Sequence, residues 1–140
     1  MATFYYYFRE NMQALGLPAP DSLFGNLQLA LGTAATLVNH IEKFGKRVTV
    51  RELIVAGLRS EKLAVVASLS AAYYTGAVIG SIAIASGRTI SGGRSMADVL
   101  WDARQNGLHR PWLHEIMRRH PIIYDKTVTG RGSVGSRMIR

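Results

Sequence analysis

The sequence contains no cysteine, so neither a disulfide framework nor a cysteine-ligated metal site can form. Charge is also scarce, because charged residues make up 19% of the 140 residues and the mean hydropathy is +0.08. Acidic residues are especially few: nine stand against 17 lysines and arginines, which gives a formal net charge of +8. A chain of this length fits a single domain over residues 1–140, with a composition near the border between soluble and membrane proteins. The basic excess favours an anionic partner.

The first ten residues lack the basic and apolar regions of a cleavable secretory signal. We therefore expect synthesis in the cytoplasm and secretion by a route that does not use a leader. An aromatic run, FYYYF, occupies residues 4–8. We expect these rings to pack in a core, and an aromatic anchor at a membrane interface is the alternative.

One long stretch without a charged residue covers residues 63–86. As a helix it would be about 36 Å long, enough to cross a hydrocarbon layer about 30 Å thick. Small side chains recur there at every fourth position, and we name this set the small-residue ridge: Ala64, Ser68, Ala72, Gly76 and Gly80. Such a ridge allows two helix backbones to approach closely, either in lipid or inside a soluble helical bundle.

The drive for this stretch to insert into a membrane is modest. Its leucine, isoleucine and valine residues supply roughly −2.4 to −4.8 kcal/mol, whereas its serines, tyrosines and glycines oppose insertion. A marginal segment of this kind suits a protein that stays soluble with a carrier and inserts later. A buried helix of a soluble bundle is the alternative.

Helix signals predict an all-α fold in which two long helices form an antiparallel hairpin, packed through small residues as in a glycine zipper. The first helix would cover residues 21–43. The second would cover residues 49–86, because Thr49 and Glu52 have the spacing of a capping box; a break near Ser60 is the alternative. Basic residues bracket the uncharged stretch and are expected at the headgroup level of a membrane: Arg59, Lys62, Arg88 and Arg94.

Two short amphipathic helices are predicted over residues 95–120. Ser95 and Asp98 have the spacing of a second capping box, and Pro111 suits the first turn of the second helix. Residues 124–140 are rich in glycine, serine and arginine, so we expect a flexible basic tail there.

Motifs that would indicate catalysis or cofactor binding are incomplete. Residues 130–135 match G-x-G-x-x-G, but the helix that would hold a dinucleotide does not follow. His114 and Glu115 begin like a zinc-peptidase motif, but Arg118 stands where the second histidine is required. Neither paired carboxylates nor a serine, histidine and aspartate order stands out. The sequence therefore predicts no catalytic, cofactor-binding or metal-binding residues and a protein that is not an enzyme.

Basic and aromatic residues alternate near the amphipathic pair and form what we name the basic stripe: Trp101, Arg104, His109, Arg110, Trp112, Arg118 and Arg119. Such a stripe can bind nucleic acid through phosphates and stacking, or lie on an anionic membrane. A solvated helix face with two core tryptophans is the third interpretation and the one we favour. A nucleic-acid-binding fold signature does not accompany the stripe, so a nucleic-acid partner is not predicted.

A small basic chain without cysteine or leader, with glycine-zipper segments over residues 25–32 and 64–80, resembles the small pore-forming effectors of bacterial type VI secretion systems. The resemblance rests on this pattern and covers the middle half of the chain. It implies carriage inside the hexameric tube protein, delivery to a rival cell, insertion into its inner membrane and leakage of small ions. It also implies a membrane immunity protein in the producing cell. An anionic lipid membrane and further copies of the inserted chain are the other expected partners.

The predicted function is therefore an antibacterial toxin that permeabilises a membrane through oligomerised helices, with the small-residue ridge at their contact. Two alternatives stay open. One is a soluble helical binding or adaptor protein that buries this helix. The other is an enzymatic toxin that acts on nucleic acid or on a nucleotide.

Overall fold

The chain has an all-α architecture, as the sequence predicts. The computed structural model describes residues 3–56, 63, 66–87 and 95–125, and within these ranges it contains seven α-helices, short 3-10 segments and no strand. In chain order the elements are α1 (Thr3–Ala14), α2 (Asp21–Phe24), α3 (Leu27–Phe44), α4 (Val50–Val55), α5 (Ala71–Gly87), α6 (Met96–Gln105), α7 (Pro111–Arg119) and the 3-10 helix η2 (Pro121–Ile123).

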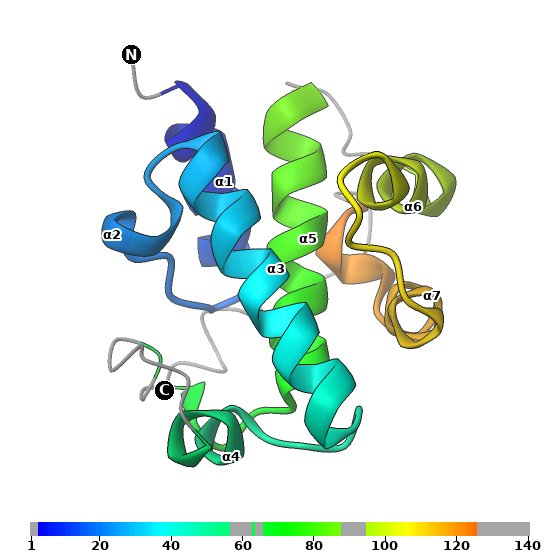
Figure 1. Ribbon diagram of the computed structural model, residues 1–140. Coiled ribbons are helices and arrows are strands. Elements are labelled where there is room, and N and C mark those ends of the chain that lie inside the picture. Colours follow the sequence, from blue (N-terminus) through cyan, green and yellow to red (C-terminus); the bar gives the residue numbers. More distant parts are fainter. Residues whose placement is uncertain (1–2, 57–62, 64–65, 88–94, 126–140) are drawn as a thin grey trace.

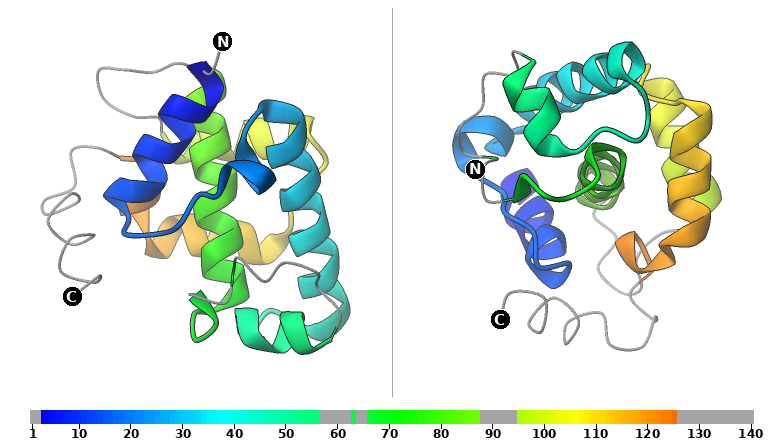
Figure 2. Two further views of the ribbon diagram at one scale, coloured as in Figure 1. Left: turned by 90° about the vertical axis from the view of Figure 1, so that its left-hand side faces the viewer. Right: turned by 90° about the horizontal axis from the view of Figure 1, so that it is seen from below.

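Helix α5 runs through the centre of the molecule (Figure 1). Figure 2 shows the other helices around it, with α1 and α3 on one side and α6, α7 and η2 on the other. The helix has no charged residue, and every residue at positions 74–85 is buried. A helix of this composition has no polar face to turn toward water, so its neighbours must cover its whole circumference.

The helix expected over residues 21–43 is two helices, α2 and α3, because Asn26 separates them. The backbone of Asn26 is extended, and its side-chain oxygen accepts a hydrogen bond from the Leu29 N–H at 2.8 Å. This bond satisfies an amide in the first turn of α3 that would otherwise lack a partner. α3 ends before Gly45, whose φ of +102° is a conformation that favours glycine.

The helix expected over residues 49–86 is also divided, into α4 and α5. The capping box is present as predicted: the Glu52 N–H donates to Thr49 Oγ1 at 3.3 Å, and the Thr49 N–H donates to the Glu52 carboxylate at 2.8 Å. However, α4 has only six residues, and α5 begins at Ala71. The Ala71 N–H donates to the Val48 carbonyl at 2.9 Å, so the connector before α4 holds the start of α5 beside it.

The amphipathic pair expected over residues 95–120 is present as α6 and α7. The second capping box is confirmed, since the Asp98 N–H donates to Ser95 Oγ at 3.2 Å. Pro111 occupies the start of α7, as expected. Each helix buries one face, through Val99, Leu100 and Ala103 in α6 and through Leu113 and Met117 in α7.

The first residue of the tail expected to be flexible over residues 124–140 is packed into the fold. Tyr124 is buried, and its hydroxyl donates to the Met117 carbonyl at 3.3 Å. This contact holds Tyr124 against α7, and the sequence pattern could not indicate it because glycines and arginines dominate the segment. Residues 126–140 lie outside the described ranges.

The N-terminal aromatic run belongs to α1. Phe8 is fully buried and stacks on Phe24 of α2, with ring centroids 4.8 Å apart. Tyr6 lies on the other side of α1 and is 50% exposed. The core interpretation therefore holds for Phe8 and fails for Tyr6, because a helix places the two residues on different faces.

A buried hydrogen-bond cluster joins α1 to α5 and η2. Asn11 Nδ2 donates to Ser81 Oγ at 2.8 Å and to the Ile123 carbonyl at 3.0 Å. A partly buried bond joins the Tyr74 hydroxyl on α5 to the Pro18 carbonyl, shortly after α1, at 3.2 Å. Burial raises the pKa of Tyr74, which keeps its phenol protonated as a donor. These bonds fix α1 at one rotation and height against α5.

Ser81→Ala is expected to lower the free energy of unfolding by about 1–2 kcal/mol. The substitution removes a buried acceptor and leaves one N–H of the Asn11 side-chain amide without a hydrogen-bond partner. Urea denaturation followed by circular dichroism measures the change. Ser86→Ala is the matched control, since Ser86 lies on the same helix but is exposed. Equal stability of the two variants would contradict a stabilising role for the Asn11 cluster.

Candidate functional site

The small-residue ridge is divided between α5 and the residues before it. Ala72, Gly76 and Gly80 lie on α5 and are buried. Ser68 is exposed in the turn that precedes α5, and Ala64 lies outside the described residues. The fold thus brings three of the five ridge residues onto one helix.

Side chains of the same chain fill the space above the two ridge glycines. A Cβ atom at Gly76 would lie 2.6 Å from Ile116 Cγ2 on α7, and one at Gly80 would overlap Ile123 Cγ2 on η2. Met117 Cε lies 3.8 Å and 3.7 Å from the same two positions. Carbon atoms in good contact are about 3.5–4.0 Å apart. Only glycine therefore lets α7 and η2 cross α5 at this distance.

Within the described residues, none of the helices combines the length and the apolar character needed to span a bilayer. The four residues expected at headgroup level all lie outside the described ranges: Arg59, Lys62, Arg88 and Arg94. Ser60, near which a helix break is the alternative, also lies outside them. The place of the four basic residues at a membrane surface stays a prediction.

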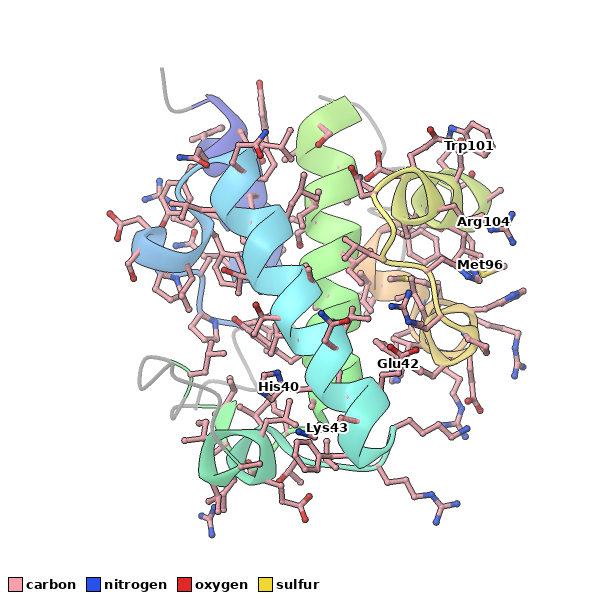
Figure 3. The ribbon with its side chains drawn as sticks, in the orientation of Figure 1. His40, Glu42, Lys43, Met96, Trp101 and Arg104 are labelled. Atoms are coloured by element: carbon pink, nitrogen blue, oxygen red, sulfur yellow. The ribbon has the colours of Figure 1, made fainter. Side chains whose placement is uncertain are left out.

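The basic stripe does not form one surface. Trp101 is 61% exposed, and Figure 3 shows it projecting with Arg104 from α6 away from the bundle. The expectation that both tryptophans lie in the core is wrong for Trp101, because α6 buries the opposite face. Trp112 is half-buried and packs against the core from α7.

Arg110 of the stripe has a structural role. Its Nε donates to Glu42 Oε2 at 3.0 Å, which joins the loop before α7 to the end of α3. The same guanidinium donates to the carbonyls of Gly107 and His109 at 3.3 Å and 2.8 Å. Burial is the main cause that lowers the pKa of His109, and the positive charge of Arg104 is the next largest. This part of the stripe thus holds the loop between α6 and α7 in place.

Cationic side chains from separate elements meet at a hollow of about 400 Å³, which we name the Lys46 hollow. Its lining comes from the connector after α3, the start of α5 and one face of α7: Lys46, Arg47, Ser70, Ala72, Trp112, Glu115, Ile116 and Arg119. Lys46 Nζ lies 3.4 Å from Glu115 Oε1. The Ser70 hydroxyl oxygen accepts the Tyr73 N–H at 3.2 Å, which leaves the hydroxyl proton for another acceptor.

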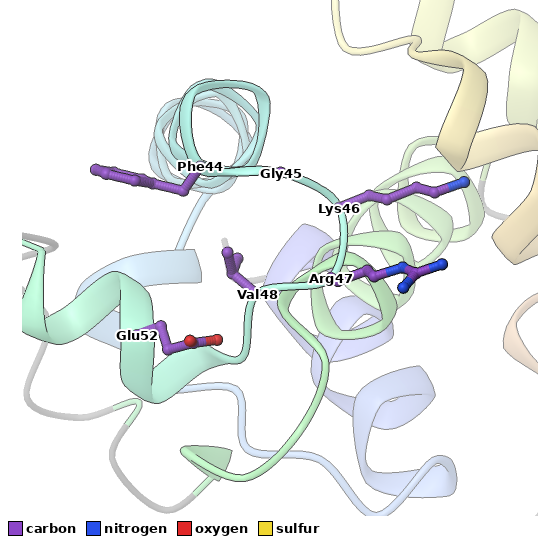
Figure 4. A pocket seen from close by; sticks show the side chains of 6 residues that line it. All are labelled: Phe44, Gly45, Lys46, Arg47, Val48 and Glu52. Atoms are coloured by element: carbon purple, nitrogen blue, oxygen red, sulfur yellow. The ribbon is translucent and has the colours of Figure 1, made fainter.

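Lys46 and Arg47 are the residues of this site that the sequence does not indicate. Figure 4 shows both side chains projecting to one side of the connector, away from Phe44 and Glu52. Lys46 and Arg47 also line, together with Phe44 and Glu52, a neighbouring hollow of about 470 Å³. The contact of Lys46 with Glu115 joins residues 69 positions apart. Local periodicity cannot report such a contact, so only the fold reveals the cluster.

The described residues contain no group of three histidine, aspartate or glutamate side chains placed to hold a metal ion. Comparisons with protein-family models, with curated proteins and with solved structures give no match to the chain.

Proposed function

We propose that this protein is a helical binding protein that acts as a folded monomer and contacts an anionic partner through the cationic residues of the Lys46 hollow. The observation that carries the proposal is the contact of Ile116 and Ile123 with Gly76 and Gly80. This contact gives both glycines a purpose inside one chain. It therefore favours the interpretation of the ridge as part of a soluble bundle.

Energetics support the closed arrangement in water. Ile123 and Met117 are fully buried, and exposing one such side chain costs about 1.5–3 kcal/mol. Removing α7 and η2 would also expose the apolar side of α5 beneath them. A partner that needs α5 uncovered would have to offset both costs, whereas a partner at the Lys46 hollow requires neither.

The purified chain is expected to be monomeric without detergent and to leave anionic vesicles intact at physiological salt. Light scattering coupled to size exclusion measures the first property, and release of a trapped fluorescent dye measures the second. Dye release would contradict the proposal and favour the membrane function. A heat-unfolded sample is the control, because its exposed α5 segment should interact with the same vesicles.

Membrane permeabilisation is the second candidate, and the composition of α5 favours it. A helix without charge and apolar around its circumference suits a lipid environment as well as a protein core. Insertion would require α7 and η2 to leave α5, so that the ridge glycines could pack against another copy as a hairpin with a glycine zipper. The secretion carrier, the immunity protein and action at a target-cell inner membrane belong to this candidate.

A further inference from the structure

The Lys46 hollow has the charge pattern of an anion-binding site. Three cationic side chains line it, Lys46, Arg47 and Arg119, against the single carboxylate of Glu115. Within the described part of the chain, neither arginine side chain forms an ion pair. An arginine guanidinium offers several donors in a fixed plane, which matches the oxygens of a phosphate.

Trp112 adds a flat aromatic surface to the same hollow. The side chain is only half-buried, so part of the indole can meet a ligand. Tryptophan stacks well on planar rings, including the bases of nucleotides. Its presence beside the arginines favours a ligand that carries a planar ring next to its negative charge.

The size of the hollow fits a small molecule. About 400 Å³ lies in the range of roughly 300–1,000 Å³ that is typical of small-molecule sites. The polar groups come from the connector after α3, from Ser70 and from α7, so they surround a ligand from several directions. A flat lipid surface would reach only the outermost of these groups.

We propose that the Lys46 hollow binds a nucleoside phosphate, with the phosphates held by Lys46, Arg47 and Arg119 and the base stacked on Trp112. This proposal rests on the proposed function and names its ligand class. Glu115 opposes binding in this arrangement, because its carboxylate repels the phosphates and holds Lys46 at 3.4 Å.

The test uses the intrinsic fluorescence of Trp112. The chain has two tryptophans, so Trp101→Phe leaves Trp112 as the single reporter, and the exposed position of Trp101 makes this change mild. Titration with ADP is expected to change the Trp112 emission in a saturable way. Adenosine alone and pyrophosphate alone are expected to bind more weakly than ADP, because each uses only one half of the site.

Variants in the same background identify the contacts. Arg119→Gln is expected to weaken ADP binding about tenfold through loss of a charged hydrogen bond. Arg118→Gln is the matched control: it removes the same charge from the last turn of α7, but Arg118 does not line the hollow. Glu115→Gln is expected to strengthen binding, because it frees Lys46 and removes the repelling carboxylate.

Three results would overturn the nucleotide proposal: no response to ADP, equal losses in Arg118→Gln and Arg119→Gln, or binding only to a single-stranded oligonucleotide or to anionic vesicles. Equal losses would indicate general charge attraction in place of a site. These outcomes are separate from the monomer and dye-release measurements, which test the proposed function without any nucleotide.

Discussion

The double variant Gly76→Ala/Gly80→Ala is expected to lower the free energy of unfolding by about 2–6 kcal/mol, since overpacking costs about 1–3 kcal/mol at each site. The new methyl groups would meet Cγ2 of Ile116 and of Ile123. These atoms are branches at Cβ, which rotate less freely than the end of a long side chain. The helices must therefore move apart, and thermal and urea denaturation would measure the loss.

Gly32→Ala is the control for this prediction. Gly32 lies on α3, and a Cβ atom there would meet nothing within 4 Å. The substitution should raise stability by about 0.5–1 kcal/mol, because alanine favours the helical backbone more than glycine does. If alanine at Gly76 and Gly80 were stabilising as well, the close approach of α7 and η2 to α5 would be refuted.

A rescue variant identifies the contact itself. Ile116→Leu moves the side-chain branch from Cβ to Cγ and so removes the atom that meets Gly76, while it keeps the apolar volume. Gly76→Ala/Ile116→Leu is therefore expected to recover part of the stability that Gly76→Ala loses. A double-mutant cycle measures this coupling, which is expected only for residues in contact. Leucine at Gly76 and Gly80 would, by the same reasoning, prevent the chain from folding. A loss of membrane leakage in such a variant would therefore not show that the two glycines line a pore.

A disulfide between α5 and α7 should separate the two candidate functions with a large effect. A Cβ atom at Gly76 would lie 3.6 Å from Ile116 Cβ, within the range of about 3.5–4.5 Å found in disulfides. Gly76→Cys/Ile116→Cys is expected to form this bond, because the chain has no other cysteine. The oxidised variant should gain about 2–4 kcal/mol of stability over the reduced one.

The proposed function predicts that the oxidised and reduced forms behave alike toward vesicles and that both remain monomeric. The permeabilising function predicts dye release from the reduced form alone, because the disulfide prevents α7 from leaving α5. Gly80→Cys/Ile123→Cys provides a second lock, since a Cβ at Gly80 would lie 3.9 Å from Ile123 Cβ. Release that reductant switches on in both variants would reject the monomeric binding protein.

Sequence patterns predicted the features that depend on near neighbours. The capping boxes at Thr49 and Ser95 each join residues three positions apart, so they could be recognised directly. The division between α4 and α5 is accompanied by the hydrogen bond from the Ala71 N–H to the Val48 carbonyl. This bond joins residues far apart in the sequence, so local patterns do not indicate it. The helix predicted over residues 49–86 is therefore two shorter helices, and α5 covers only the later part of the uncharged stretch.

The candidate site depended even more on distant contacts. Gly76 and Gly80 lie where α7 and η2 come close to α5, but their spacing in the sequence could not identify these partners. The partners are Ile116 and Ile123 of the same chain, whereas the same glycine spacing would also suit contact between two copies of the chain. The meeting of Lys46 with Glu115 likewise requires α3, α5 and α7 to be in place.

The central position of α5 also affects how the protein is made. A ribosome synthesises the chain from its N-terminus at about 5–20 residues per second, so α5 exists for seconds before α7 and η2 follow. During that time α1 and α3 can cover one flank of α5, while the side of Gly76 and Gly80 has no cover. Chaperones that bind apolar segments would act on the nascent chain in this interval, and a translational pause before Pro111 would prolong it.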